Sequence, residues 1–135
     1  MEYSDKVKWL KRYRNDLAPM ISLIYEAKEL RSISESISIN WSGLPGGGDG
    51  PTKVEKALEA IEGLLDNIQM EREAIETHRA EILRAIDSLA DKRERDVLRY
   101  LYINGFSRDE VSARMGYAER YVYQLQRNAI EELKI

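Results

Sequence analysis

The segment from about residue 118 to residue 133 carries side chains that can hydrogen-bond to the edges of nucleic-acid bases and to phosphates. Arginine can donate a bidentate pair of hydrogen bonds to guanine, glutamine can do the same to adenine, and tyrosine can bond a phosphate or pack on a thymine methyl group. Apolar residues recur between them at the spacing of a helix, which predicts that the polar face is turned outward. The apolar positions are Val122, Leu125 and Ala129. The outward set is Glu119, Arg120, Tyr123, Gln124 and Arg127.

The residues just before this segment predict a shorter helix and a tight turn. Ser107 can cap the shorter helix, and Glu110 stands three residues later, as a capping box requires. Val111 and Met115 then point inward. Gly116 follows where the turn needs a left-handed backbone, a conformation that glycine adopts without strain.

A further helix is predicted upstream. Asp91 can cap this helix, with Glu94 closing a second capping box, and Asn104 and Gly105 can end it. An apolar face between these limits makes it a supporting helix for the two that follow.

Taken in order, the positions from Val111 onward are apolar, small, apolar, glycine and apolar, followed by two apolar residues three apart. Ser112 supplies the small residue where two helices cross closely. This is the pattern of a helix-turn-helix motif, so residues 91–135 are predicted to form a DNA-binding domain. Ser107 joins the outward set as a candidate DNA-binding residue. The alternative is a generic three-helix bundle that contacts another protein.

The first 90 residues predict a helical arm. Apolar residues at mixed three- and four-residue steps indicate a helix over about residues 4–39, with Pro19 predicted to kink it or split it in two. Residues 42–51 hold five glycines and two prolines and are predicted to be a hinge. Thr52 can cap a second long helix.

The second long helix carries a stripe of apolar residues spaced by seven, which predicts coiled-coil packing. The stripe consists of Val54, Ile61, Ile68, Ile75, Ile82 and Leu89. The flanking positions become polar near His78, so the partner is expected to be narrow or partly polar there. The partner is either the first helix, folded back as an antiparallel hairpin, or a second copy of the chain. The expected fold is all-α, with an arm over residues 1–90 and a DNA-binding domain over residues 91–135.

Several classes of function find little support in the sequence. There is no cysteine, and the single histidine, His78, has no second histidine near it, so no metal site and no cofactor are expected. The glycine run is not a phosphate-binding loop, because Pro51-Thr52-Lys53 follows Gly50 and no strand precedes it. Paired carboxylates lie on expected helix surfaces. We therefore expect no enzyme and no catalytic residue.

The net charge of −3 is distributed unevenly along the chain. Residues 41–90 hold 5 basic against 10 acidic side chains, whereas residues 91–135 hold 9 against 8. Attraction to phosphate must therefore come from the arrangement of basic groups and not from bulk charge. No apolar stretch is long enough to cross a membrane, and the expected location is the cytoplasm.

The stretch from Arg93 to Leu133 resembles region 4 of bacterial sigma factors, and the whole chain resembles small phage and prophage regulators of the ArpU and RinA types. The residues that carry the first resemblance are Glu94-Arg95-Asp96-Val97-Leu98, Gly105-Phe106-Ser107, Glu110-Val111, Met115-Gly116-Tyr117, Tyr121-Val122-Tyr123, Ala129-Ile130 and Leu133. The resemblance implies a transcription activator of late phage genes. Ala118 and Glu119 depart from the polar start that is usual in that family.

The expected partners are double-stranded DNA, together with RNA polymerase or a second copy of the chain bound through the arm. The competing interpretation is a coiled-coil structural or assembly protein of a phage, including a DNA-packaging factor similar to a small terminase subunit. The helix-turn-helix interpretation explains more residues, since it accounts for the caps, the turn glycine and the outward polar set together.

Overall fold

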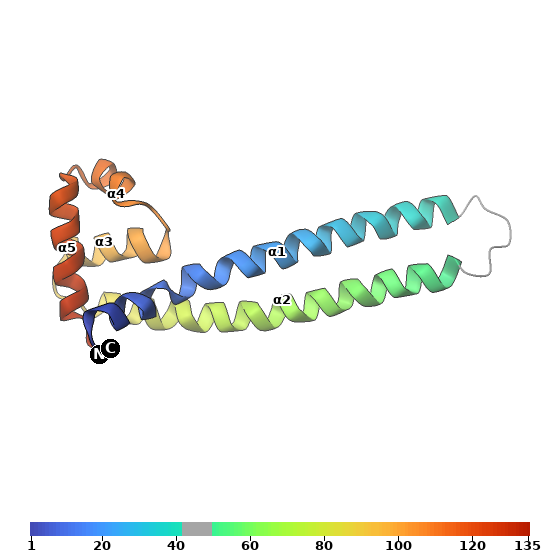
Figure 1. Cartoon of the computed structure of the whole chain (residues 1–135), viewed down its shortest axis with the longest axis horizontal. Coiled ribbons are helices and arrows are strands. Elements are labelled where there is room, and N and C mark those ends of the chain that lie inside the picture. Colours follow the sequence, from blue (N-terminus) through green and yellow to red (C-terminus); the bar gives the residue numbers. More distant parts are fainter. Residues whose placement is uncertain (42–49) are drawn as a thin grey trace. The chain divides into compact units, whose positions relative to one another are not determined.

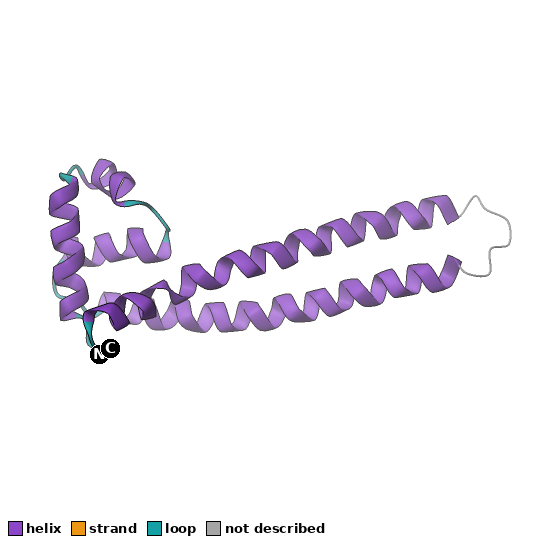
Figure 2. Cartoon of the chain, viewed as in Figure 1, coloured by secondary structure: helices purple, strands orange, loops and turns teal. Residues whose placement is uncertain are grey.

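The computed structural model describes the backbone of residues 1–41 and 50–135, and the side chains outside residues 34 and 36–54. Every regular element over this part of the chain is a helix, and it contains no strand (Figure 2). The prediction of an all-α fold is therefore confirmed. The elements are α1 (Tyr3–Trp41), α2 (Gly50–Asp87), α3 (Lys92–Leu98), the π-helix η1 (Arg99–Ile103), α4 (Arg108–Met115) and α5 (Glu119–Glu132). Within the same residues, no helix combines the length and the apolar character that spanning a bilayer needs.

The chain divides into two compact units. The first unit contains residues 1–17 and 74–135, and the second contains residues 18–73. The beginning of α1 and the end of α2 therefore belong to the same unit as α3, η1, α4 and α5. The division that we predicted between residues 90 and 91 falls inside the first unit and stays a prediction.

In the first unit, the beginning of α1 runs antiparallel to the end of α2 (Figure 1). The Arg12 guanidinium lies 2.8 Å from the Glu81 carboxylate, and His78 Nδ1 lies 2.7 Å from an Asp16 carboxylate oxygen. Leu10 lies between these helices in a core cluster with Ile82. The partly polar partner expected near His78 is therefore Asp16 of the same chain.

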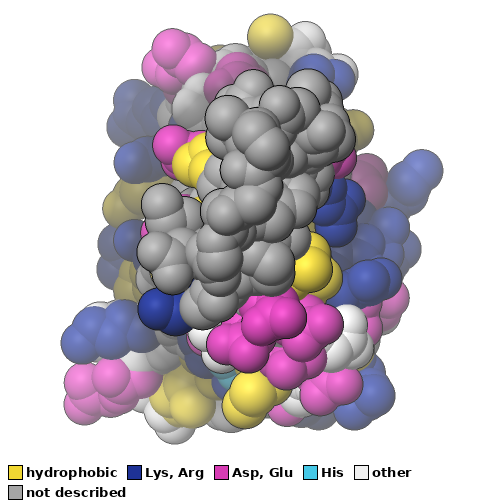
Figure 3. Space-filling model, turned by 90° about the vertical axis from the view of Figure 1, so that its right-hand side faces the viewer, with side chains coloured by type: hydrophobic (Ala, Val, Ile, Leu, Met, Phe, Trp, Pro, Cys, Tyr) yellow, Lys and Arg dark blue, Asp and Glu magenta, His cyan; other side chains and the backbone are white. Residues whose placement is uncertain are grey.

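In the second unit, residues 18–41 of α1 and 50–73 of α2 lie side by side (Figure 1). Their apolar contact is thin. Ala27 and Ile61 are buried, whereas Leu58 and Leu65 remain exposed to solvent. The surface is acidic, and Figure 3 shows Asp and Glu side chains gathered on the face that it draws.

The helix limits correct two expectations. Helix α1 continues through Pro19, so the predicted division into two helices is wrong. Helix α2 begins at Gly50, two residues before the predicted cap Thr52, which places the last two residues of the predicted hinge inside the helix. A proline is tolerated at Pro51 because the amide groups of a first helical turn have no partner within the helix. Residues 42–49, the rest of the predicted hinge, lie outside the described residues.

The caps of the C-terminal helices follow the sequence closely. Ser107 caps α4 with a complete capping box, in which its hydroxyl accepts from the Glu110 amide at 3.2 Å. Gly116 ends α4 with φ of 71°, the left-handed conformation that was predicted. Asp91 caps α3, but it accepts from the Arg93 amide and Glu94 does not close the box. The Glu94 side chain instead faces Glu132 near the end of α5.

Two core clusters hold the first unit together. The smaller cluster joins α3, α4 and α5 through Val97, Val111, Val122 and Leu125, all of which are buried. The larger cluster joins α1, α2, α3, η1 and the end of α5. Its members are Leu10, Ile82, Ile86, Leu89, Leu98, Tyr102, Ile103, Ala129, Ile130 and Leu133.

We expect Ile82→Ala to lower the free energy of unfolding by about 2 to 5 kcal/mol, because it leaves a cavity in the larger cluster. Ile82 is 0% exposed. The matched control is Met70→Ala, since Met70 lies on the same helix and is 69% exposed. The control should change the free energy by less than about 0.5 kcal/mol. Chemical denaturation measures both values, and equal effects of the two substitutions would contradict the packing described above.

Candidate nucleic-acid interface

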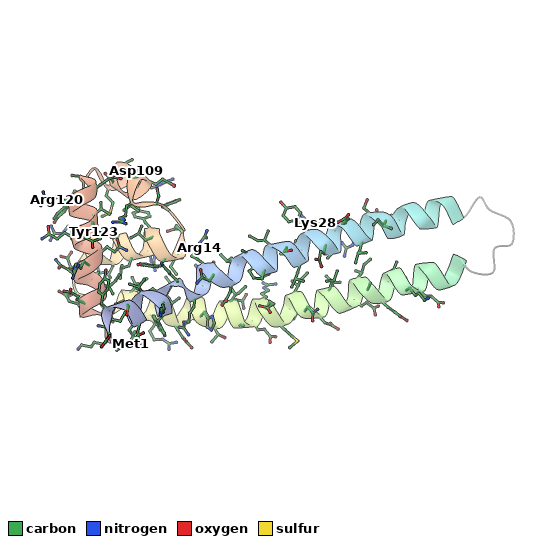
Figure 4. All side chains as sticks on the ribbon, viewed as in Figure 1. Met1, Arg14, Lys28, Asp109, Arg120 and Tyr123 are labelled. Atoms are coloured by element: carbon green, nitrogen blue, oxygen red, sulfur yellow. The ribbon has the colours of Figure 1, made fainter. Side chains whose placement is uncertain are left out.

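Helix α5 separates an apolar face from a polar face. Val122, Leu125 and Ala129 are buried as predicted, which turns the positions between them to the surface. Arg120, Gln124 and Arg127 are exposed, and Tyr123 is 42% exposed. Figure 4 shows Arg120 on the side of α5 away from α3. The structure therefore places the predicted polar set on one accessible helix surface.

A groove of about 490 Å³ lies between the beginning of α4 and the beginning of α5. It brings together four of the six predicted site residues and leaves out Gln124 and Arg127. Its lining consists of Ser107, Arg108, Asp109, Glu119, Arg120 and Tyr123. Arg108 and Asp109 were missed by the sequence argument. The signal that could have found them is their position in the first turn of α4, directly after the Ser107 cap.

The hydroxyl of Ser107 is occupied by the cap of its own helix. It accepts from the Glu110 amide and lies 3.2 Å from a Glu110 carboxylate oxygen, to which it donates. The same carboxylate also accepts from the Ser107 amide at 3.4 Å. Ser107 therefore serves mainly to begin α4, and the backbone around it forms one wall of the groove.

Two carboxyl groups meet in the groove. The Glu119 and Asp109 side chains are hydrogen-bonded, and this contact raises the pKa of Glu119 while nearby Arg108 opposes the shift. The pair places negative charge beside Arg120 at the beginning of α5. Such oxygens repel phosphates, and they can accept from the amino group of cytosine.

Aromatic and cationic side chains alternate along one flank of α5. The Arg108 guanidinium lies over the Tyr123 ring, 5.0 Å from its centroid. The Arg127 side chain interacts with Tyr123 and lies 3.4 Å from a Glu131 carboxylate oxygen. These contacts hold two guanidinium groups at defined places on the accessible surface.

The opposite flank of α5 carries a second basic cluster. The Arg93 guanidinium donates to the Tyr121 hydroxyl at 2.7 Å and also pairs with Asp91 at 3.1 Å. The hydrogen bonds from the Arg93 side chain and backbone lower the pKa of Asp91. A second groove lies beside this contact, lined by Lys92, Arg93, Asp96, Tyr100, Arg114, Met115 and Tyr117. The sequence argument did not single out these cations, because it did not place α3 and the turn before α5 side by side.

Hydrogen bonding fixes the turn between α4 and α5. The Ser112 hydroxyl donates to the Tyr117 carbonyl, and the Gly116 amide donates to the Ser112 carbonyl at 3.0 Å. The Tyr117 ring meets the Tyr121 ring edge to face, with centroids 5.0 Å apart. Ser112 was predicted as a small residue at a close helix crossing. Its hydroxyl also supplies a hydrogen bond to the turn, which the prediction did not include.

One carboxylate of the first unit is buried. Glu94 is 6% exposed, and its Oε2 atom has no hydrogen-bond partner among the described residues. Desolvation raises the pKa of Glu94 to about 7, with further contributions from the hydrogen bond and the charge of Glu132. A carboxyl group in this setting is favoured in its protonated form.

Among the described residues, no group of three or more histidine, cysteine, aspartate or glutamate side chains is arranged to hold a metal ion. The single histidine, His78, is engaged with Asp16 on the long helices.

These features define a class of all-α protein in which a compact unit with a polar, partly basic helix face includes one end of each of two long helices. Residues 56–134 match the family model described as "Protein of unknown function (DUF1492)". The match covers more than half of the chain, and the protein belongs to this family. The matched segment begins within α2 and contains all of the surface described above. No curated protein and no solved structure gives a significant match.

The buried carboxyl group predicts a dependence of stability on pH. The folded-state pKa of Glu94 lies above its ordinary value of 4.5, at about 7, so the folded protein holds more protons than the unfolded chain between these values. The free energy of unfolding should therefore fall as pH rises through this window. Glu94→Gln should remove this decrease and be more stable than the wild type by about 1 to 3 kcal/mol near pH 8, because no buried charge remains.

Denaturant unfolding at several pH values measures the effect. Glu62→Gln is the control, since Glu62 is exposed on α2 and its substitution should leave the wild-type profile unchanged. If Glu94→Gln followed the wild-type profile as well, Glu94 would not be the group that titrates.

Proposed function

We propose that α4 and α5 form a helix-turn-helix motif, that α5 is its recognition helix, and that the protein is a sequence-specific DNA-binding transcription regulator. The observation that carries this proposal is the turn at Gly116, which joins two helices packed through Val111 and Val122. The packing leaves Arg120 and Gln124 exposed one turn apart on the second helix. In such motifs the second helix enters the major groove and contacts bases with residues near its beginning.

The distribution of cations supports this proposal better than the net charge does. A helix in the major groove has a phosphate backbone on each side. Arg108 and Arg127 lie on the flank of α5 that carries Tyr123, whereas Lys92 and Arg93 lie near the flank that carries Tyr121. Two basic flanks with a base-reading face between them are the arrangement that such a complex needs.

The acidic pair formed by Asp109 of α4 and Glu119 of α5 has a place in the same proposal. Arg120 can donate to guanine, and Glu119 beside it can accept from a cytosine amino group. Arg120 and Glu119 together would discriminate against other bases. The negative charge of Glu119 would also weaken non-specific binding. A chain with little net positive charge would then depend strongly on its cognate sequence.

The second unit supports a protein-contact role. It exposes apolar side chains that include Ile21, Tyr25, Leu58 and Leu65. We propose that this unit contacts RNA polymerase or a second copy of the chain, and the resemblance to phage regulators favours activation of late genes in the bacterial cytoplasm. The same exposed residues also favour the alternative function, a coiled-coil assembly or DNA-packaging factor. Sedimentation at several concentrations distinguishes self-association from a monomer, because only association depends on concentration.

Arginine substitutions on α5 test the DNA-binding proposal directly. Arg120→Ala should weaken binding to the cognate site by about 1 to 3 kcal/mol and weaken binding to unrelated DNA much less, since a base contact is lost. Arg127→Ala should weaken binding to all sequences alike and reduce the slope of log K against log salt by about one, since a phosphate contact is lost.

The cognate site is first selected from fragments of the source genome, and binding is then titrated at two salt concentrations. Arg31→Ala is the control, because Arg31 is an exposed arginine of the second unit. A wild-type protein that is folded by circular dichroism and binds no DNA at low salt would refute the proposal. The three-helix protein-contact bundle would then explain residues 91–135 better.

Removal of the Glu119 charge gives a separate test of the acidic pair. Glu119→Gln should bind unrelated DNA about threefold more tightly, because one group that repels phosphate becomes neutral. The specificity ratio for the cognate site should fall at the same time. Glu62→Gln again serves as the control, and an unchanged affinity for unrelated DNA would place Glu119 outside the interface.

A further inference from the structure

The beginning of α1 lies against the second half of α5. The Arg127 guanidinium lies over the Tyr3 ring, 5.5 Å from its centroid. Tyr3 is half-buried, and one part of its ring packs on the larger core cluster. The packing fixes the ring, and the contact with Arg127 places Tyr3 at the edge of the candidate interface.

A lysine on the same helix fixes this arrangement. Lys6 Nζ donates to the Glu131 carbonyl at 3.0 Å and to the Leu133 carbonyl at 2.8 Å. The last carbonyls of a helix lack partners within the helix, and a cation there is also favoured by the helix dipole. Lys6 is therefore a positioning residue that holds the first turns of α1 against the end of α5.

Tyr3 is the last of four side chains that contact one another in a row. The row begins with Arg108 on α4 and continues through Tyr123 and Arg127. The Arg108 guanidinium lies over the Tyr123 ring, Arg127 interacts with Tyr123, and the Arg127 guanidinium lies over the Tyr3 ring. Burial is the main cause that raises the pKa of Tyr3, and Tyr123 adds to it. The Tyr3 hydroxyl is therefore a neutral hydrogen-bond donor under ordinary conditions, on a ring that lies under an exposed guanidinium group.

We infer that one strand of a DNA duplex follows this row with its phosphodiester backbone, and that the Tyr3 hydroxyl donates to a phosphate next to the one bound by Arg127. The inference rests on the proposed function and extends its interface beyond the helix-turn-helix motif. The matched family segment begins at residue 56, so this contact comes from a part of the chain outside that segment. The first turns of α1 are then a part of the DNA-binding surface and not only of the arm.

Tyr3→Phe tests the inference because it keeps the ring under Arg127 and removes only the hydroxyl. We expect binding to cognate and unrelated DNA to weaken alike by about 10- to 150-fold, the loss typical of one hydrogen bond to a charged group. The slope of log K against log salt should stay as in the wild type, because a neutral group releases no counterion. Tyr13→Phe is the matched control, since Tyr13 lies on the same helix and, like Tyr3, is half-buried against the larger core cluster.

Ethylation interference adds a readout that a structural role of Tyr3 would not change. Ethylation of one phosphate should weaken the wild-type complex and have no effect on the complex of Tyr3→Phe. If the wild type binds DNA and Arg127→Ala weakens it, while Tyr3→Phe binds as tightly as the wild type, the inference is wrong and the proposed function stands. If the folded wild type binds no DNA, both are wrong.

Discussion

The packing of the end of α5 against the first turns of α1 is the contact on which the first unit depends. Ala129, Ile130 and Leu133 are buried in one cluster with Leu10. Without this cluster, α5 would be held only by the smaller cluster around Val122. The apolar face of α5 therefore makes two contacts. One is with α3 and α4, and the other is with the long helices. The polar face of α5 is oriented as a result of both contacts.

Local features of this fold could be predicted from the sequence, because neighbouring residues determine them. The Ser107 cap with Glu110 and the left-handed Gly116 depend on spacings of a few residues, and both are observed. The buried positions of α5 followed from helical periodicity in the same way. Helix α1 was predicted to kink or to divide at Pro19 because a proline removes one hydrogen bond, yet the rest of a long helix retains enough of them to continue as one helix.

The contacts that sequence reasoning missed join segments far apart in the chain. Arg93 meets Tyr121 only because α3 packs across α5, and no spacing in the sequence encodes that crossing. Glu94 was expected to close a cap. Its position on α3 instead faces the interior, where the end of α5 brings a second carboxylate close to it. Such pairs depend on tertiary packing, which overrides the local preference of each residue.

The composition of the first unit also has a consequence for synthesis on the ribosome. Leu10 belongs to the same buried cluster as Leu133, a partner that is translated much later. At about 5 to 20 residues per second, Leu133 is synthesised roughly 6 to 25 s after Leu10. During this interval the part of the apolar face of α1 that the end of α5 covers is open to other nascent chains and to chaperones. Efficient production of the protein therefore depends on what protects that face before translation reaches the end of α5.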